Sequence, residues 1–189
     1  DAAGNESAGQ LVTLDINNID EVAPTFESLT LAIVAENIEV DSGVYRAQVD
    51  DSGDISAGIT FSLKETSDAA LVIDENTGLV TITESPNYEI RSSYSFTVVA
   101  SDGVNANVEQ LVALQITNLD ESDPIITSAE TADAIDENSG VSQVIYKVTS
   151  DDSADVSYGV TYSLVDNLEE ALSIDTNTGE VTLAANPDA

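Results

Sequence analysis

The side chains most suited to chemistry in this sequence are carboxylates that gather in short clusters. One kind of cluster precedes a proline, at residues 18–21 and 118–121, and another fills loops, at residues 50–54 and 151–155. Converging carboxylates repel one another unless a cation lies between them. Oxygen-rich sites of this kind suit hard cations, so the clusters favour metal binding, with Ca²⁺ as the leading candidate.

The composition excludes most other chemistry. The 189 residues include 36 Asp+Glu against 4 Lys+Arg, a formal net charge of -32, and there is no Cys or His. Nothing here could neutralise phosphates, so we expect no nucleic-acid partner. Zinc sites, thiol chemistry and an imidazole base are also excluded. The hydrophobic share of 42% indicates a folded chain despite the charge.

The sequence repeats itself at a spacing of 100 to 101 residues. Residues 58–63 (GITFSL) return as residues 159–164 (GVTYSL), and residues 10–14 (QLVTL) return as residues 110–114 (QLVAL). Roughly half of the aligned residues are identical, which indicates a tandem array.

The repeat predicts three parts, which are the tail of one repeat (1–20), a complete repeat (21–120) and the first part of another (121–189). Counterparts of residues 89–120 are absent from the last copy, so either the polypeptide continues or a neighbouring chain supplies them. The chain therefore reads as a piece of something longer. It contains no stretch approaching the roughly 18 apolar residues of a membrane span and no signal peptide, so we expect no direct membrane insertion.

The pattern of the complete repeat is that of an all-β protein. Short runs rich in Val, Ile, Thr and aromatic residues are separated by Gly, Asn, Asp and Ser, and the only helical pattern is a single turn at residues 168–171. About seven short strands per repeat predict tandem Greek-key, immunoglobulin-like β-sandwiches. The clearest expected strands are residues 29–35, 44–49, 59–63, 79–83, 94–100 and 108–117.

These residues resemble the cadherin repeats, particularly those of large bacterial surface adhesins. The resemblance covers the whole chain and depends on the order and spacing of several motifs, each weak alone. The matching segments are Ala35-Glu36-Asn37, Asp50-Asp51-Ser52, Ile73 to Gly78, Asn87-Tyr88-Glu89, Ala100-Ser101-Asp102 and the linker from Asn118 to Pro124.

The resemblance implies Ca²⁺ at the junctions between consecutive repeats. The ligands implied for the junction near residue 120 are Glu36, Glu89, Asp102, Asn118, Asp120, Glu121 and Asp151, with Ser153 as a further candidate. Those implied for the junction near residue 20 are Asn18, Asp20, Glu21 and Asp50, and Glu137 would serve a later junction.

Two departures from the family pattern bear on affinity and adhesion. Asn87 and Asn118 stand where the family has Asp, which should weaken Ca²⁺ binding because the ligand charge tunes affinity. Tryptophan is absent, so adhesion by exchange of a Trp side chain cannot operate in this segment.

Each signal also has a simpler interpretation. The acids could be solvated surface charge, and we expect Asp51, Asp54, Asp152 and Asp155 to face water. Residues 74–78 predict a tight turn with Gly78 at positive φ rather than a calcium loop. Phe61 and Tyr162 should pack in the core, and Asn5 begins a lone glycosylation triplet.

The sequence therefore predicts a non-catalytic, calcium-stiffened stalk or spacer of a secreted or cell-surface bacterial adhesin, such as one used in biofilms. Its expected partners are the adjacent repeats. Paired carboxylates could suggest a glycosidase, but the acids recur with the repeat and lie in polar loops. The alternatives left open are a calcium-dependent carbohydrate-binding module and a self-binding module, either homophilic or filament-forming. In the filament, residues 10–16 would be donated to a neighbour.

Overall fold

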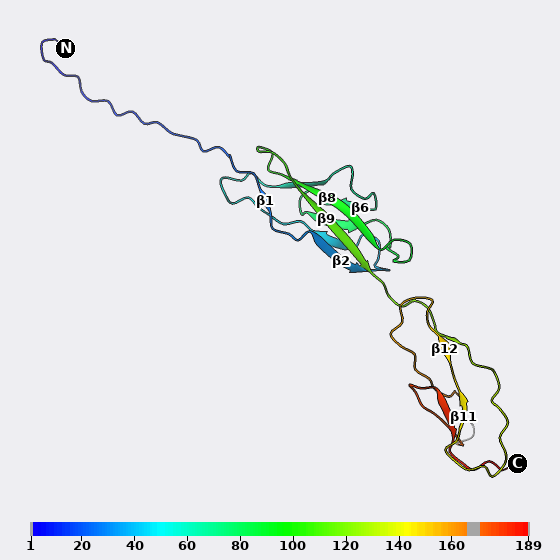
Figure 1. Ribbon diagram of the computed structural model, residues 1–189. Helices are drawn as coiled ribbons and strands as arrows, with labels where there is room; N and C mark the ends of the chain where they lie inside the picture. Colours follow the sequence, from blue (N-terminus) through cyan, green and yellow to red (C-terminus); the bar gives the residue numbers. More distant parts are fainter. Residues whose placement is uncertain (1, 166–170, 189) are drawn as a thin grey trace. The chain divides into compact units, whose positions relative to one another are not determined.

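The structure of the protein is a computed structural model that describes residues 2–165 and 171–188 (Figure 1). It divides into two compact units, unit 1 (Asp1–Thr117) and unit 2 (Asn118–Ala189). The described residues form strands and turns, as the all-β prediction requires. None of them forms a helix long and apolar enough to cross a membrane. The helical turn expected at residues 168–171 falls almost wholly outside the described residues.

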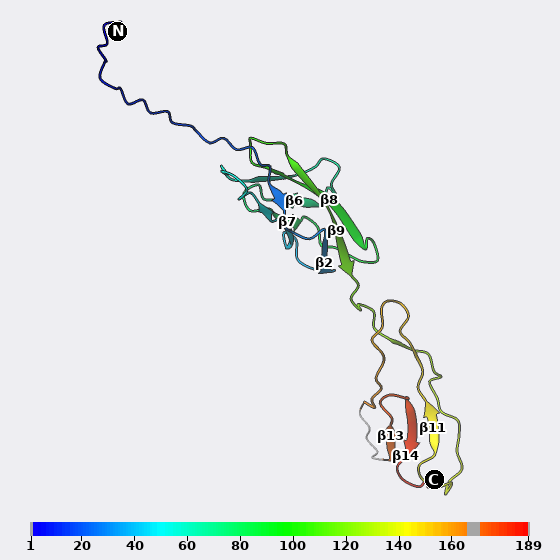
Figure 2. The ribbon, with the colours of Figure 1, turned by 60° about the vertical axis from the view of Figure 1, so that its left-hand side comes forward.

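Unit 1 contains two main sheets and one short pair of strands (Figures 1 and 2). The first sheet has the order β2-β9-β8-β5, in which β2 and β9 run parallel and the other neighbours antiparallel. The second sheet has the order β3-β7-β6, and β1 pairs with β4. The bounds are β1 Thr25–Phe26, β2 Leu31–Ala35, β3 Gly43–Arg46, β4 Val49–Asp50, β5 Thr60–Leu63, β6 Leu71–Ile73, β7 Leu79–Ile82, β8 Ser93–Ser101 and β9 Val108–Thr117.

The long strands β8 and β9 supply most of the core of unit 1. Along each strand, buried residues alternate with exposed or half-buried ones, because successive side chains point to opposite faces. Burial of a large apolar side chain contributes about 1.5–3 kcal/mol. The buried residues on these strands are Tyr94, Phe96, Val98, Ala100, Val112, Leu114 and Ile116, all at most 4% exposed.

The turn between β6 and β7 confirms the interpretation of residues 74–78. One carboxylate oxygen of Asp74 accepts the backbone N–H of Asn76 and of Thr77, at 3.1 and 2.8 Å. Gly78 has φ of 66°, and a Cβ there would lie 3.0 Å from the carbonyl oxygen of Ala47. The acid is therefore used to close a turn, and only glycine fits at its end.

Unit 2 repeats part of this pattern. β11 (Val144–Lys147), β14 (Glu180–Leu183) and β13 (Leu172–Ile174) form one sheet in that order, visible as neighbours in Figure 2. β10 (Ile125–Ile126) pairs with β12 (Ser150–Asp151). Among the described residues of unit 2, only Val181 and Leu183 are buried hydrophobic residues. Tyr162 is half-buried, so the expectation of core packing holds for Phe61 (9% exposed) more fully than for Tyr162.

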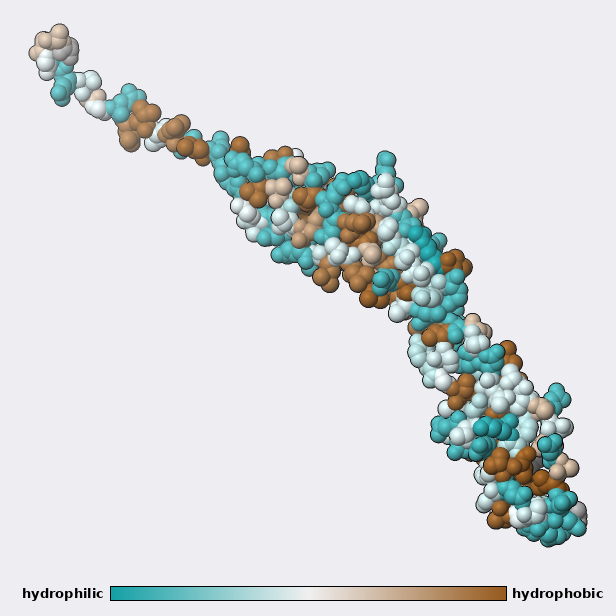
Figure 3. Space-filling view, viewed as in Figure 1, coloured by the Kyte–Doolittle hydropathy of each residue, from teal (hydrophilic) through white to brown (hydrophobic). Residues whose placement is uncertain are grey.

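The N-terminal segment of unit 1, up to β1, forms no strand. The large apolar side chains of residues 11–19 are exposed to solvent, and Figure 3 shows hydrophobic residues gathered along the segment. The exposed fractions are 90% for Leu11, 78% for Val12, 84% for Leu14 and 87% for Ile16.

Candidate metal centre

Strand pairing brings Glu36 and Glu89 to the same end of the first sheet. Glu36 follows β2, and its backbone N–H donates to the carbonyl oxygen of Thr117, the last residue of β9, at 3.1 Å. Glu89 precedes β8, whose first residue Ser93 pairs with Gln115 near the end of β9. Two acids 53 positions apart in the sequence therefore meet where β9 ends.

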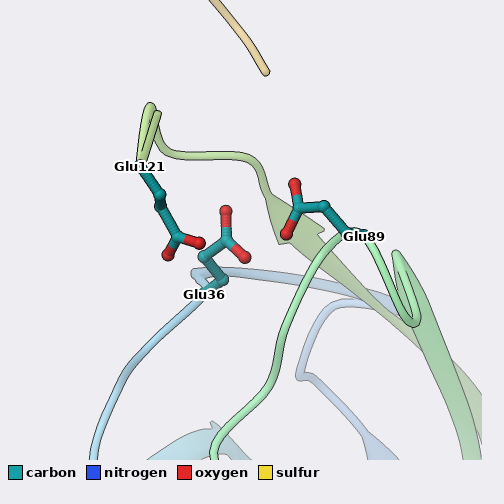
Figure 4. A group of neighbouring side chains, drawn as sticks. All are labelled: Glu36, Glu89 and Glu121. Atoms are coloured by element: carbon teal, nitrogen blue, oxygen red, sulfur yellow. The ribbon is translucent and has the colours of Figure 1, made fainter. Parts of the chain in front are cut away.

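A third carboxylate, from Glu121 in the segment after β9, completes the group. One carboxylate oxygen from each of Glu36, Glu89 and Glu121 can be chosen so that all lie within 4.8 Å of one another. Figure 4 shows the three carboxylates turned toward a common space. Ca²⁺ binds oxygen at about 2.3–2.6 Å, so ligands on opposite sides of one ion lie up to about 5 Å apart. The spacing therefore fits a single calcium ion.

The environment of Glu36 adds to this fit. Glu36 is only 1% exposed, and its Oε2 accepts the backbone N–H of Tyr88 at 2.7 Å. A buried carboxylate is costly unless it is hydrogen-bonded and its charge is balanced. Here the nearest carboxylates carry the same charge, so a cation would relieve the repulsion.

Further buried oxygens in the linkers and the neighbouring loop lack a hydrogen-bond donor. They are Asp20 Oδ2, Asp51 Oδ2 and Asn118 Oδ1. Buried acceptors are nearly always paired, so each of these needs a partner. Calcium accepts carboxylate and amide oxygens as ligands, so this donor set is the kind that it binds.

The linker near residue 20 is held by Asp54. The carboxylate of Asp54 accepts the side-chain amide of Asn18 at 2.6 Å, the backbone N–H of Glu21 at 3.4 Å and its neighbour Ile55 N–H at 2.9 Å. In unit 2, Asp155 accepts the backbone N–H of Glu121 at 3.0 Å, which repeats the contact. Neither acid is among the ligands predicted from the sequence. Their recurrence at one spacing after each linker was the signal that could have found them.

The pKa values of Glu21 and Asp54 are shifted by the polar groups packed around them. A hydrogen bond with the carboxylate of Asp54 raises the pKa of Glu21, and partial burial and the charges of Asp54 and Asp20 act in the same direction. The hydrogen bond from Asn18 lowers the pKa of Asp54, with the backbone N–H of Ile55 contributing. Glu21 therefore holds its proton more tightly than an ordinary glutamate, and a cation bound here would compete with that proton.

In the loops at residues 50–54 and 151–155, the acids that face water are not the ones expected. Asp50 and Asp151 are exposed, and each accepts the backbone N–H two residues later, from Ser52 and from Ser153, at 3.0 Å. Asp51, Asp54, Asp152 and Asp155, which we expected to face water, are half-buried. The first acid closes its own turn, and that turn directs the later acids inward.

Asp102 lies at the other end of unit 1 from Glu36 and Glu89, so its grouping with the site near residue 120 is wrong. It follows β8, and the pairing of Ala100 with Val108 places it where β9 begins. The nine residues of β8 span about 30 Å. Asp102 is 5% exposed, and the backbone N–H groups of Val104 and Asn105 lower its pKa. Val104 lines a cavity with Asn18, Ile19 and Asp20, so the loop that follows Asp102 lies beside the linker near residue 20.

Of the other predicted ligands, Asp20 and Asp120 lie in the two linkers. Asp120 uses Oδ1 to accept the backbone N–H of Ser122 at 3.4 Å, as Asp20 accepts that of Val22 at 3.2 Å. Glu137 and Asp151 are exposed in unit 2.

Several known proteins are similar to this chain in sequence. No family model matches the chain. Among curated proteins, it is 26% identical to Protein dachsous of Drosophila melanogaster over 174 residues, covering 86% of this chain and 5% of that protein. It is 30% identical to human Protocadherin Fat 4 over 182 residues, covering 92% and 4%. The chain thus spans about a twentieth of the relatives it matches.

Solved structures show the same likeness. The crystal structure of mouse Cadherin-23 EC22-24 matches with a TM-score of 0.61 and 27% identity, over 87% of this chain and 55% of that one. The extracellular cadherin domains 3-6 of Protocadherin Gamma B2 match with a TM-score of 0.66 and 19% identity, over 92% and 45%.

The chain is cadherin-like in sequence and has the all-β sandwich fold of cadherin extracellular repeats, as expected. The relatives are extracellular and non-enzymatic, in agreement with a secreted or cell-surface location and with a non-catalytic role. Protein dachsous, Protocadherin Fat 4 and Cadherin-23 come from animals, so these relatives do not show a bacterial source.

Proposed function

We propose that this segment is a non-catalytic spacer of a secreted or cell-surface adhesion protein, stiffened by Ca²⁺ at the junctions between its repeats. In this proposal residues 21–120 form a complete repeat, residues 1–20 the tail of a preceding one and residues 121–189 the first part of the next. A large bacterial adhesin is the parent that the sequence motifs suggest.

The observation that carries the proposal is the convergence of Glu36, Glu89 and Glu121, with ligand oxygens within 4.8 Å of one another. Support comes from the buried oxygens of Asp20 and Asp51, which have no donor. Both groups of acids adjoin a linker between repeats. A cation held there would bind groups from the sheet end and from the linker together.

The mechanism is electrostatic and mechanical. Without a cation, the carboxylates repel one another and favour arrangements that separate the linker from the sheet end. With Ca²⁺ bound, those arrangements become costly because they would break ligand bonds. Extracellular calcium modules bind at about 10⁻⁴–10⁻³ M. At about 10 mM Ca²⁺, mass action then adds about 1.4–2.7 kcal/mol per site.

The test is a calcium titration of the whole chain, followed by thermal unfolding and small-angle scattering. We expect Ca²⁺, and not Mg²⁺ at the same concentration, to raise the melting temperature and to increase the maximum particle dimension. EDTA should reverse both changes. If neither quantity changes by about 10 mM Ca²⁺, above the affinity range of such modules, the carboxylates are surface charge and the proposal fails.

A matched pair of variants localises the effect. Glu89→Gln keeps the size of an exposed side chain and removes one ligand charge, so it should weaken the calcium response about tenfold or more. Glu65→Gln makes the same change at an exposed acid outside the group and should leave the response unchanged. Glu36→Gln is a weaker test because Glu36 also accepts a hydrogen bond within unit 1.

A carbohydrate-binding module has less support. Sugar platforms need exposed aromatic rings, and the rings of unit 1 lie largely in the core. Phe61, Tyr94 and Phe96 are at most 9% exposed, and Tyr45 packs edge-on against Phe96.

A further inference from the structure

The outer face of the first sheet of unit 1 carries apolar side chains that the core does not use. Leu31 and Ile33 on β2 are 44% and 59% exposed, and Leu111 on β9 is 65% exposed, because they alternate with the residues that pack inward. Leu31 lies opposite Ala113, two residues along β9 from Leu111, so these four side chains form one outer patch. Hydrophobic residues gather in Figure 3 on the side of unit 1 where Figure 1 places β2. A contiguous apolar patch indicates an interaction site, whereas single scattered apolar residues do not.

The large side chains of the outer patch on β2 are not a requirement of the repeat. At the repeat spacing, Leu31 and Ile33 correspond to Ala132 and Ala134 of the next copy. Val34, which packs against the core of unit 1, corresponds to Ile135, so the inward position keeps a large apolar residue. The outward positions of β2 therefore accept small residues, and the large ones in unit 1 need a reason other than the fold.

The same face is almost free of charge in a strongly acidic protein. The whole chain has 36 acidic residues and a formal net charge of -32. In the four strands β2, β9, β8 and β5, all of whose residues the structure describes, the only charged residue is Glu109. Lys64, which follows β5, pairs with Glu109 at 2.7 Å. A molecule as acidic as this one would be repelled by the loops but not by this face.

We propose that two copies of this chain bind each other side by side through this face of unit 1, with the outer patch at the centre of the contact. The charge of the protein favours a second copy as the partner. A basic protein would be drawn to the acidic loops, where Coulomb attraction is available, rather than to a neutral face. A partner that shares the acidity approaches most closely where charge is absent or paired. The same patch then lies on both sides of the contact, as a two-fold interface requires.

The size of the face predicts a weak dimer. Strands lie about 4.8 Å apart and the nine residues of β8 span about 30 Å, so the four strands present about 500 Å². Two copies would together bury about 1,000 Å², which is near the lower limit for a specific interface. The acidic loops of the two copies still repel each other, so added salt should strengthen the association by screening that repulsion.

The test compares Ile33→Glu with Val72→Glu in the whole chain by sedimentation equilibrium over a wide range of protein concentrations. Val72 lies on β6 of the second sheet and is 47% exposed, so this control adds the same charge to the other sheet. We expect the unchanged chain and Val72→Glu to dimerise at high concentration and high salt, and Ile33→Glu to dimerise at least about tenfold more weakly. The measurement is made in EDTA, so its result does not depend on the calcium proposal.

A second variant separates loss of the patch from damage to the fold. Replacing Leu31 and Ile33 together by Ala gives β2 the residues that the next copy has at these positions, Ala132 and Ala134. This double variant removes the large side chains without adding charge. Its melting temperature at low protein concentration should stay close to that of the unchanged chain, because surface substitutions change stability little. Its dimerisation should still be weakened.

Single cysteines identify the face, because the chain has no Cys of its own. Ala113 lies within the outer patch, so a two-fold contact centred there brings its two copies close together. Ala113→Cys should therefore be linked into dimers by a short bismaleimide, whereas Ala69→Cys, at an exposed alanine between β5 and β6, should not. A monomer at every concentration, equal weakening by Ile33→Glu and Val72→Glu, or equal cross-linking at both cysteines would each overturn the proposal.

Discussion

Units 1 and 2 contain copies of the same sequence repeat, but they differ in how much of their apolar face is buried by other strands. The turn before β7 in unit 1 recurs before β14 in unit 2, with Asp74 and Asp175 each accepting the backbone N–H of the residues two and three positions later. The sheet β2-β9-β8-β5 has no counterpart among the described residues of unit 2. Turns therefore form from local sequence, whereas a closed core requires the two long strands.

The difference is visible in burial at matched positions. Val80 and Ile82 on β7 are 0% exposed, while Val181 and Leu183 on β14 are 5% and 8% exposed. The hairpin keeps its inward face in both units. Positions that contact β8 or β9 in unit 1 are more exposed in unit 2. Phe61 is buried, whereas the matching Tyr162 is half-buried.

The largest expected effect tests this difference directly. Phe61→Ala should destabilise unit 1 by about 3 kcal/mol, because it leaves a cavity in a closed core. Tyr162→Ala should cost about 1 kcal/mol or less, because that ring is already half in solvent. Hydrogen exchange of the amides of β8 and β14 would report each unit separately. Equal losses at the two positions would show that unit 2 has a closed core after all.

Replacing glycines by alanine tests the turn before β7 and β14, which the two units share. Gly78→Ala and Gly179→Ala should each cost about 1–3 kcal/mol, because φ is 66° and 69° and the new Cβ would meet backbone oxygens at 3.0 and 2.7 Å. Gly103→Ala is the control, since φ is 80° there but nothing lies within 4 Å of the new Cβ. It should cost only the backbone strain, about 1–2 kcal/mol. If Gly179→Ala had no effect, the turn of unit 2 would not depend on its local geometry.

The smallest effect concerns pH and an ion pair found in unit 1. Burial by itself raises the pKa of Asp68, but hydrogen bonds from Arg91 and from Ser95 N–H, with the charge of Arg91, outweigh it and lower the pKa. A lowered pKa stabilises the fold above the unfolded value of about 3.9, and the gain is lost as pH falls through the folded pKa. Asp68→Asn should therefore lower the melting temperature at neutral pH, with a difference that shrinks below about pH 4.

The control for this prediction is the exposed pair of Lys64 and Glu109, whose side chains are both 47% exposed. Glu109→Gln should change stability by no more than about 0.5 kcal/mol at any pH. A difference for Asp68→Asn that persists unchanged into acid would mean that the carboxylate's charge is not what stabilises unit 1.

The repeat and the strands of unit 1 could be predicted from the sequence because both depend on local or periodic signals. Each of the expected strands overlaps one or more observed strands, although residues 44–49 divide into β3 and β4, and β1 and β6 were not singled out. These are two- and three-residue strands. Such short strands leave almost no periodicity to detect.

The class of chemistry and the class of fold follow from the amino-acid sequence alone. A chain with 36 acidic residues, no His and no Cys can bind cations only through oxygen, and its alternation of polar and apolar residues specifies strands. Which acids come together depends instead on how the strands pair in three dimensions. Glu36 meets Glu89 because β2 lies beside the end of β9, and Asp102 is placed at the opposite end because β8 runs antiparallel to β9. Proximity between distant residues depends on strand pairing and register, and neither is written in the local sequence.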